Sequence, residues 1–220
     1  MSVLLLVRHG QASWGEADYD RLSPRGVEQS RLLGAALAGR AVRPDLVLRG
    51  SLRRHRETAD AAIAGAGWAA EVDEDAGWDE FDHMRTLTGS VDWQEIEGGG
   101  YDERVRRFEA TIERWASGRH DHEYHESFPA FRTRVEEALA RTLERLEPKQ
   151  TAVVFTSGGP VSWVAATLTD GGTPAWGRLS KVVVNSSVTK VLDGRRGTNL
   201  ISFNDHAHLE GVDPDLLTYR

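Results

Sequence analysis

The feature that most constrains this chain is a continuous aliphatic run, Val3 to Val7, that ends at once in Arg8, His9 and Gly10. A strand whose successive residues are all apolar has both of its faces buried, which is typical of a central strand in a parallel sheet. The polar residues that follow then lie beyond the carboxyl end of that strand. Open α/β sheets bind their ligands at this edge, so the tripeptide is a candidate binding site.

The rest of the chain alternates between helical and strand patterns. Apolar spacing predicts helices at about 27–39, 51–65, 102–116 and 128–146, and short apolar runs predict strands within 44–50 and 151–159. Ser51 is the candidate N-cap of the second helix. Turn residues in the tail predict short strands up to about residue 205. This order predicts an α/β fold, a three-layer α/β/α arrangement with a largely parallel central sheet.

Length and composition set the domain organisation. A chain of 220 residues with 40% hydrophobic content can fill one sizeable core, so we expect a single domain covering 1–220. Between about 77 and 125 the sequence carries scattered tryptophans, a "GGG" and acidic residues. We expect this segment to be an insertion over the sheet edge.

Composition also excludes several classes of partner. The formal net charge of -7 would repel a nucleic-acid backbone, so we expect no nucleic-acid partner. No apolar stretch is long enough to cross a bilayer, so we expect no membrane partner and a cytoplasmic location. The chain has no cysteine, which removes disulfides and thiolate metal ligands. The oligomeric state stays open, with a homodimer as one option.

Three histidines stand close together at His120, His122 and His125. Their spacing matches neither a helical i, i+4 pair nor a zinc-finger pattern, so a polar surface loop is the favoured interpretation. We therefore expect no metal site and no cofactor.

An arginine and a histidine beside each other suit phosphate chemistry. The Arg8 guanidinium carries a fork of donors that matches phosphate oxygens, and a nearby cation keeps the His9 imidazole neutral and nucleophilic. Gly10 would let the backbone turn closely around an anion. Taken alone, the tripeptide could equally begin a surface loop.

A second strand end points to the same chemistry. In "SLRRHRETA" Arg54 would sit on the first turn of a helix, where backbone N–H groups already favour an anion. Arg53 and Arg56 cannot point to the same site as Arg54, so we expect both to lie on a solvated helix face.

Several motifs in the same order resemble the histidine phosphatases, also called the phosphoglycerate-mutase-like superfamily. They are "LVRHGQA", "LSPRGVEQSRLLG" and "SLRRHRETA", which is similar to the family's Ser-x-Leu-x-Arg-Ala-x-Gln-Thr-Ala, followed by "ESFPAFRTRVEEAL", "VVFTSGGPV" and "FNDHAHL". The resemblance covers nearly the whole chain and places the family's helix arginine on Arg54.

The resemblance implies a phosphatase in which His9 attacks phosphorus and is transiently phosphorylated. It implies that Arg8 and Arg54 hold the phosphoryl oxygens of a small phosphorylated substrate. Glu80 is identified with the family's proton donor to the leaving group, the alternative being a water-facing acidic loop. Phosphoglycerate mutase chemistry is the other activity that the resemblance allows.

The sequence departs from the family at Ser157, which stands where the pattern Ser-His-Gly-Gly has its second histidine. Three interpretations stay open. The Ser157 hydroxyl and the N–H groups of Gly158 and the next residue could serve as neutral donors in a slower enzyme. Another histidine, such as His83 or His206, could fold back. The protein could also bind phosphorylated ligands without turnover. In the first loop Ser13 is a further candidate for phosphate binding, because Ala12 replaces a polar residue of the family.

Overall fold

The computed structural model describes residues 1–13, 18–81 and 101–219. The chain divides into two compact units, one formed by Met1–Glu80 with Glu137–Arg220 and the other by Phe81–Glu136. The second unit overlaps the segment 77–125 that the sequence marks as an insertion. The single-domain organisation itself stays a prediction.

The first unit is built on one sheet. In the described residues this sheet has six strands in the order β3-β2-β4-β1-β5-β6. The strands are β1 (Ser2–Arg8), β2 (Leu46–Arg49), β3 (Asp73–Glu74), β4 (Thr151–Thr156), β5 (Val188–Gly194) and β6 (Gly197–Asp205). From β3 to β1 neighbouring strands are parallel, whereas β5 and β6 are antiparallel additions. The sheet is therefore mixed and mostly parallel, as the sequence predicts.

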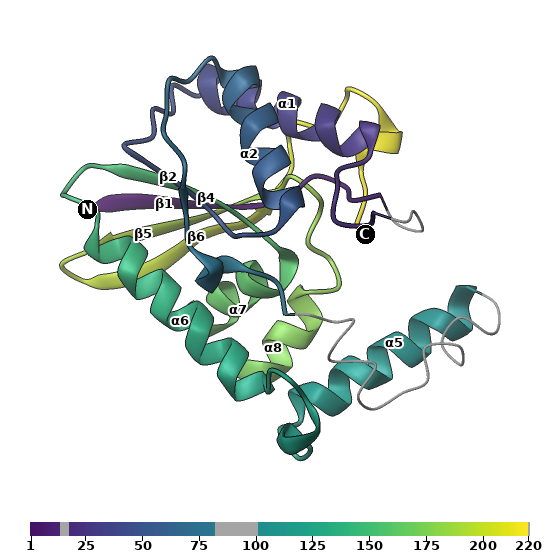
Figure 1. The fold of residues 1–220 in the computed structure, drawn as a ribbon. Helices are drawn as coiled ribbons and strands as arrows, with labels where there is room; N and C mark the ends of the chain where they lie inside the picture. Colours follow the sequence, from purple (N-terminus) through teal and green to yellow (C-terminus); the bar gives the residue numbers. More distant parts are fainter. Residues whose placement is uncertain (14–17, 82–100, 220) are drawn as a thin grey trace. The chain divides into compact units, whose positions relative to one another are not determined.

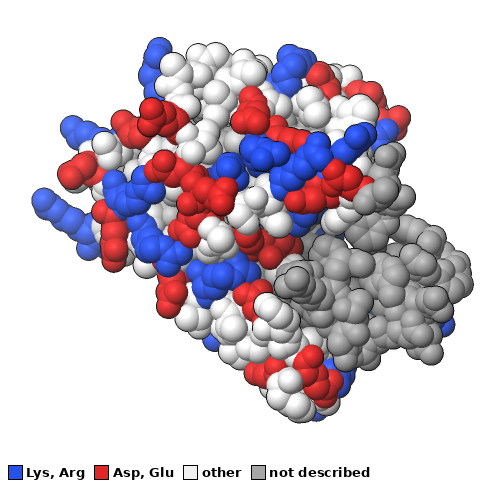
Figure 2. Space-filling view, in the orientation of Figure 1, with Lys and Arg blue, Asp and Glu red and all other residues white. Residues whose placement is uncertain are grey.

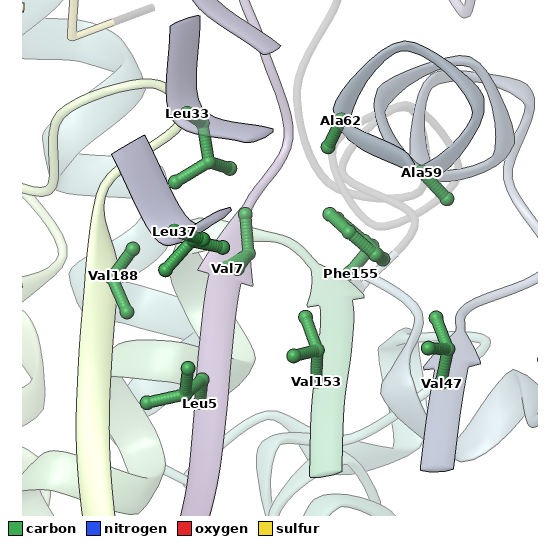
Figure 3. Packing of buried hydrophobic residues seen from close by; sticks show 10 residues of the cluster. All are labelled: Leu5, Val7, Leu33, Leu37, Val47, Ala59, Ala62, Val153, Phe155 and Val188. Atoms are coloured by element: carbon green, nitrogen blue, oxygen red, sulfur yellow. The ribbon is translucent and has the colours of Figure 1, made fainter. Parts of the chain in front are cut away.

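One face of the sheet is covered by α1 (Pro24–Gly39) and α2 (Arg53–Ala66) (Figure 1). Alternate residues of the central strands point to these helices. The buried cluster drawn in Figure 3 consists of Leu5, Val7, Leu33, Leu37, Val47, Ala59, Ala62, Val153, Phe155 and Val188. Because the helices contribute small side chains such as Ala59 and Ala62, they can approach the strands closely.

The remaining residues of the central strands point to the opposite face of the sheet. Leu4, Leu6 and Val154 are fully buried there. This face is covered by α7 (Gly158–Leu168), and α8 (Gly172–Leu179) packs against α7; Figure 1 draws both across the sheet from α1 and α2. Helices on both faces make the three layers that the continuous aliphatic strands predict.

The second unit has its own apolar cluster. It contains α5 (Tyr101–Ala116) and the first part of α6 (Phe128–Glu144). The Trp115 ring stacks on Phe81 at 4.4 Å between centroids and meets Phe128 edge-on at 5.0 Å. Both helices agree with the sequence predictions to within two residues at each bound.

Two details differ from the sequence analysis. The N-cap of α2 is Leu52, and Ser51 gives its hydroxyl and its N–H to Asp79, so Ser51 is not the cap. The helix α8 was not predicted, because its eight residues carry Gly, Thr and Pro at the start.

Charged side chains of both signs alternate over the face shown in Figure 2. In the described part of that face, blue and red groups are interspersed, and no continuous basic surface of the kind that binds nucleic acid is formed. Among the described residues, no helix combines the length and the apolar character needed to cross a bilayer.

Candidate active site

Three strand ends meet at one edge of the sheet. Because β2, β4 and β1 are neighbours in that order, the residues after them lie side by side. These residues are Gly50 and Ser51 after β2, Ser157 after β4, and His9 after β1. The three segments that the sequence singles out therefore lie together at one edge of the sheet.

The His9 ring is oriented by a hydrogen bond from one of its two nitrogens. Only 5% of its surface is exposed, and its Nδ1 lies 2.7 Å from the carbonyl oxygen of Gly10. Because a carbonyl can only accept, Nδ1 carries the proton and Nε2 keeps its lone pair. Burial lowers the pKa of His9 well below its ordinary value of 6.5, and the positive charges of Arg54 and Arg8 lower it further. The imidazole is therefore neutral at pH 7.

The two arginines approach His9 from different elements. Arg8 lies at the end of β1, and its Nη1 donates to the carbonyl oxygens of Val183 and, at 2.8 Å, of Tyr219. Arg54 lies in the first turn of α2 and is 5% exposed. Both cations act on the His9 pKa, so the structure brings together the three residues that the sequence predicts.

Arg54 is only partly satisfied. Its Nη1 donates to Oδ1 of Asp20 at 2.6 Å, and its guanidinium lies 5.6 Å from the centre of the Tyr19 ring. Within the described part of the chain, the buried Nε of Arg54 has no hydrogen-bond partner. A buried guanidinium N–H favours an anion that can accept from it.

Its neighbours in α2 behave as expected. Arg53 and Arg56 are exposed, and Arg53 pairs with Asp18 and Glu57. The prediction that these two arginines lie on a solvated face is confirmed.

Glu80 lies against the first turn of α7. Its Oε2 accepts a hydrogen bond of 3.0 Å from the N–H of Gly159. A Cβ atom on Gly159 would stand 2.0 Å from Oε1 of Glu80, so only glycine leaves room for this carboxylate. The pKa of the nearby Tyr19 hydroxyl is raised, mainly by burial. Arg54 and Arg8 oppose this rise, and the negative charge of Glu80 adds to it. Glu80 and the Arg8 guanidinium therefore lie against consecutive residues at the start of α7, Gly159 and Gly158.

Ser157 has a partner that the sequence analysis missed. It is the N-cap residue of α7, but its side chain makes no capping hydrogen bond. Instead, its Oγ lies 2.7 Å from Nε2 of His55. The His55 ring in turn lies 5.8 Å from the His9 ring between centroids. A histidine thus reaches the Ser157 side of the site, although it comes from α2.

The histidines considered for this place in the sequence analysis lie elsewhere or outside the description. His206 contacts the carbonyl oxygen of Asn204 at 2.6 Å and lies 3.6 Å from Glu210. His83 lies outside the described residues. In the described part of the chain, the histidine that contacts Ser157 is His55.

The remaining predicted phosphate-binding residues are placed as follows. The N–H of Gly10 donates to the Thr58 hydroxyl at 3.0 Å, which ties the loop to α2. Gly158 lies against Arg8, because a Cβ on it would be 3.5 Å from Nε of that arginine. Ser13 is buried, and its backbone N–H donates to the carbonyl oxygen of Arg21. Phosphate binding by Gly10, Gly158 and Ser13 stays a prediction.

The helix α2 carried a signal for His55. Residues 55, 59 and 62 follow helical spacing, so His55 shares one face of the helix with the apolar Ala59 and Ala62. Tyr19 and Asp20 had no such signal, because they belong to a loop with no periodic pattern. Among the described residues, no group of three or more His, Asp or Glu side chains could hold a metal ion.

Comparison with known proteins agrees with this geometry. Residues 4–206 match the histidine phosphatase superfamily (branch 1). A 2,3-bisphosphoglycerate-dependent phosphoglycerate mutase from Thermobifida fusca (strain YX) is 42% identical over 74 residues, which are 30% of this chain and 30% of that protein. The match therefore spans less than a third of that relative's length.

Solved structures share the fold at low sequence identity. A phosphoserine phosphatase mutant from Entamoeba histolytica in complex with phosphoserine has a TM-score of 0.69 and 20% identity, over 95% of this chain and 100% of that one. A putative alpha-ribazole-5'-P phosphatase from Escherichia coli has a TM-score of 0.68 and 23% identity, over 93% of this chain and 97% of that one. These likenesses show the fold. The family match covers most of the sequence, and the chain therefore belongs to the histidine phosphatase superfamily (branch 1).

Proposed function

We propose that the protein is a phosphomonoester hydrolase that works through a phosphohistidine on His9. The observation that carries the proposal is the His9 ring itself. Its Nδ1 is bonded to the Gly10 carbonyl, which leaves Nε2 as the nucleophile, and burial with two nearby arginines keeps the ring neutral. A neutral, oriented imidazole beside guanidinium groups is what attack on a phosphoryl group requires.

The reaction has two steps. In the first, the lone pair of His9 Nε2 forms a bond to phosphorus while the bond from phosphorus to the substrate oxygen breaks. Glu80 gives its proton to that oxygen, and the alcohol leaves. In the second, water attacks phosphorus, the bond to Nε2 breaks, and Glu80 takes the proton of the water. Arg8 and Arg54 balance the charge of the phosphoryl oxygens in both steps.

Small phosphorylated metabolites are the proposed substrates. Two of the similar structures, both of a phosphoserine phosphatase from Entamoeba histolytica, hold phosphoserine and 3-phosphoglyceric acid. The 42% identity to a phosphoglycerate mutase over 74 residues favours a second candidate, in which another hydroxyl group takes the place of water. Both candidates share the phosphohistidine.

The test compares the protein with its His9→Ala variant on nitrophenyl phosphate and on phosphoserine. We expect the protein to release phosphate and the variant to fall to the background rate. Equal background rates for both would refute hydrolysis. If orthovanadate still bound in that case, the protein would be a phosphate-recognition protein of the same fold.

A further inference from the structure

His55 is a buried histidine at the site that the proposed reaction does not yet use. Its side chain is fully buried, and its Nε2 lies 2.7 Å from the Ser157 hydroxyl oxygen. Ser157 in turn follows β4 immediately before Gly158, which lies against the Arg8 guanidinium. The Ser157 hydroxyl therefore contacts the His55 imidazole, and the next residue in the chain lies against Arg8.

A carboxylate lies on the far side of the imidazole. Oδ1 of Asp79 is 3.6 Å from Nδ1 of His55 and accepts a hydrogen bond of 2.6 Å from the Ser51 N–H. The approach depends on Gly50, because a Cβ there would stand 2.3 Å from Nδ1 and 2.5 Å from Oδ1. Asp79, His55 and Ser157 thus form a row, and its Ser157 end follows β4, the neighbour of the strand that leads to His9. We call it the Asp79–His55–Ser157 row.

The proton on His55 decides what Ser157 can do. In the neutral ring the nitrogen that faces the carboxylate carries the proton, so Nε2 accepts from the Ser157 hydroxyl. In the doubly protonated ring Nε2–H donates to that oxygen, and the hydroxyl proton is free to turn to another acceptor.

The charges around His55 favour the neutral ring in the absence of an anion. Burial lowers the pKa of His55 and Arg54 lowers it further, against the opposing effect of Asp79 and Asp20. His9, the other ring facing it, is neutral. A phosphoryl dianion would add negative charge beside Ser157 and would shift the balance toward the doubly protonated ring.

We propose that His55, which faces the Asp79 carboxylate, is a positioning residue that takes one proton from solvent when the phosphoryl group binds, and thereby turns the Ser157 hydroxyl into a donor to that group. The inference rests on the phosphatase function proposed above. It also fits the resemblance seen in the sequence, in which the pattern has alanine after the helix arginine and histidine at the place of Ser157.

The experiment measures orthovanadate binding by titration calorimetry in two buffers of different ionisation enthalpy. This gives the dissociation constant and the number of protons taken up. We expect the protein to take up close to one proton more than His55→Ala. The variant should bind about tenfold to a hundredfold more weakly, as for loss of one charge-assisted hydrogen bond. Equal proton uptake and equal affinity in both proteins would overturn the proposal.

A double variant separates positioning from a merely structural role. His55→Ala with Ser157→His moves the imidazole to the family's position and should recover at least tenfold of the lost affinity. No recovery in a folded double variant would overturn the proposal, since a structural defect at 55 is not repaired from 157. If circular dichroism shows the double variant unfolded, the proton count of His55→Ala decides. Ser162→Ala, which removes the hydroxyl of a fully buried serine in α7, is the control and should match the parent protein.

Failure of the inference can be told from failure of the proposed function. If His9→Ala abolishes phosphate release while His55→Ala keeps both the parent's rate and its vanadate affinity, the inference is wrong and the hydrolase stands. If the parent and His9→Ala release phosphate equally slowly, hydrolysis is refuted. The vanadate titration still tests the row in that case.

Discussion

Replacing Gly159 by alanine should remove the proton donor while leaving the fold intact. A Cβ at this position would lie 2.0 Å from Oε1 and 3.0 Å from Cδ of Glu80. Such distances are not tolerated, so one partner must move. The nearest atoms belong to the end of a flexible side chain, whereas Gly159 is fixed in the first turn of α7. The Glu80 carboxylate should therefore leave its place.

The two consequences of this substitution differ in size. Loss of a positioned general acid slows reaction by about 10²- to 10⁴-fold, which is about 3–5 kcal/mol in the barrier. Stability should change less, because the variant loses one carboxylate at a helix N-terminus, worth about 1 kcal/mol. Alanine is also a better helix former than glycine. Activity should thus fall much further than the free energy of unfolding.

The assay compares two leaving groups. A poor alkoxide such as that of phosphoserine needs protonation, whereas nitrophenolate leaves without it. We expect Gly159→Ala to lower kcat/KM for phosphoserine at least a hundredfold and for nitrophenyl phosphate less than tenfold. Gly177→Ala in α8 is the matched control, because a Cβ there meets nothing within 4 Å. An equal loss on both substrates would refute the acid role of Glu80, and no loss would refute its displacement.

Two further predictions follow from charge placement. Arg54→Ala should lower kcat/KM at least a hundredfold by removing a buried phosphate ligand, whereas the exposed Arg53→Ala should stay within about threefold in the same assay; similar losses would contradict the assignment of Arg54. Burial lowers the pKa of His208 from 6.5 to about 4, so the unfolded chain binds a proton that the folded chain does not as pH falls from 6.5 toward 4. Because of this histidine, the free energy of unfolding should fall by up to about 3 kcal/mol as the pH is lowered from 6.5 to 4. In urea unfolding at several pH values, His208→Gln should show a shallower fall than the parent, and parallel curves would exclude the contribution.

Much of the fold could be predicted because its signals are local. Two buried strands that end in small or polar residues, Val3–Val7 and 151–156, indicate a covered parallel sheet and the edge where ligands bind. The same reasoning places Arg54 at that edge. The antiparallel pairing of β5 with β1 was less visible, because it joins segments that are distant in the chain, whereas the pairing of β5 with β6 is local and follows from the turn at Asp193-Gly194.

The site shows where local reasoning ends. The contact between His55 and Ser157 joins residues 102 positions apart, and no motif records it. The helical spacing of Ala59 and Ala62 could have indicated that His55 faces inward, but not which residue it meets. That partner depends on β2 and β4 being neighbours, which follows from the sheet order.

The proposed mechanism requires that His9 carries the phosphoryl group during the reaction. Mixing the protein with phosphoserine or nitrophenyl phosphate, quenching in alkali and mapping the modified peptide by mass spectrometry tests it directly. We predict a phosphate on His9 that is stable in alkali, is lost in acid, and does not form in His9→Ala. Turnover without a phosphorylated His9, or with the phosphate on another residue, would contradict this mechanism.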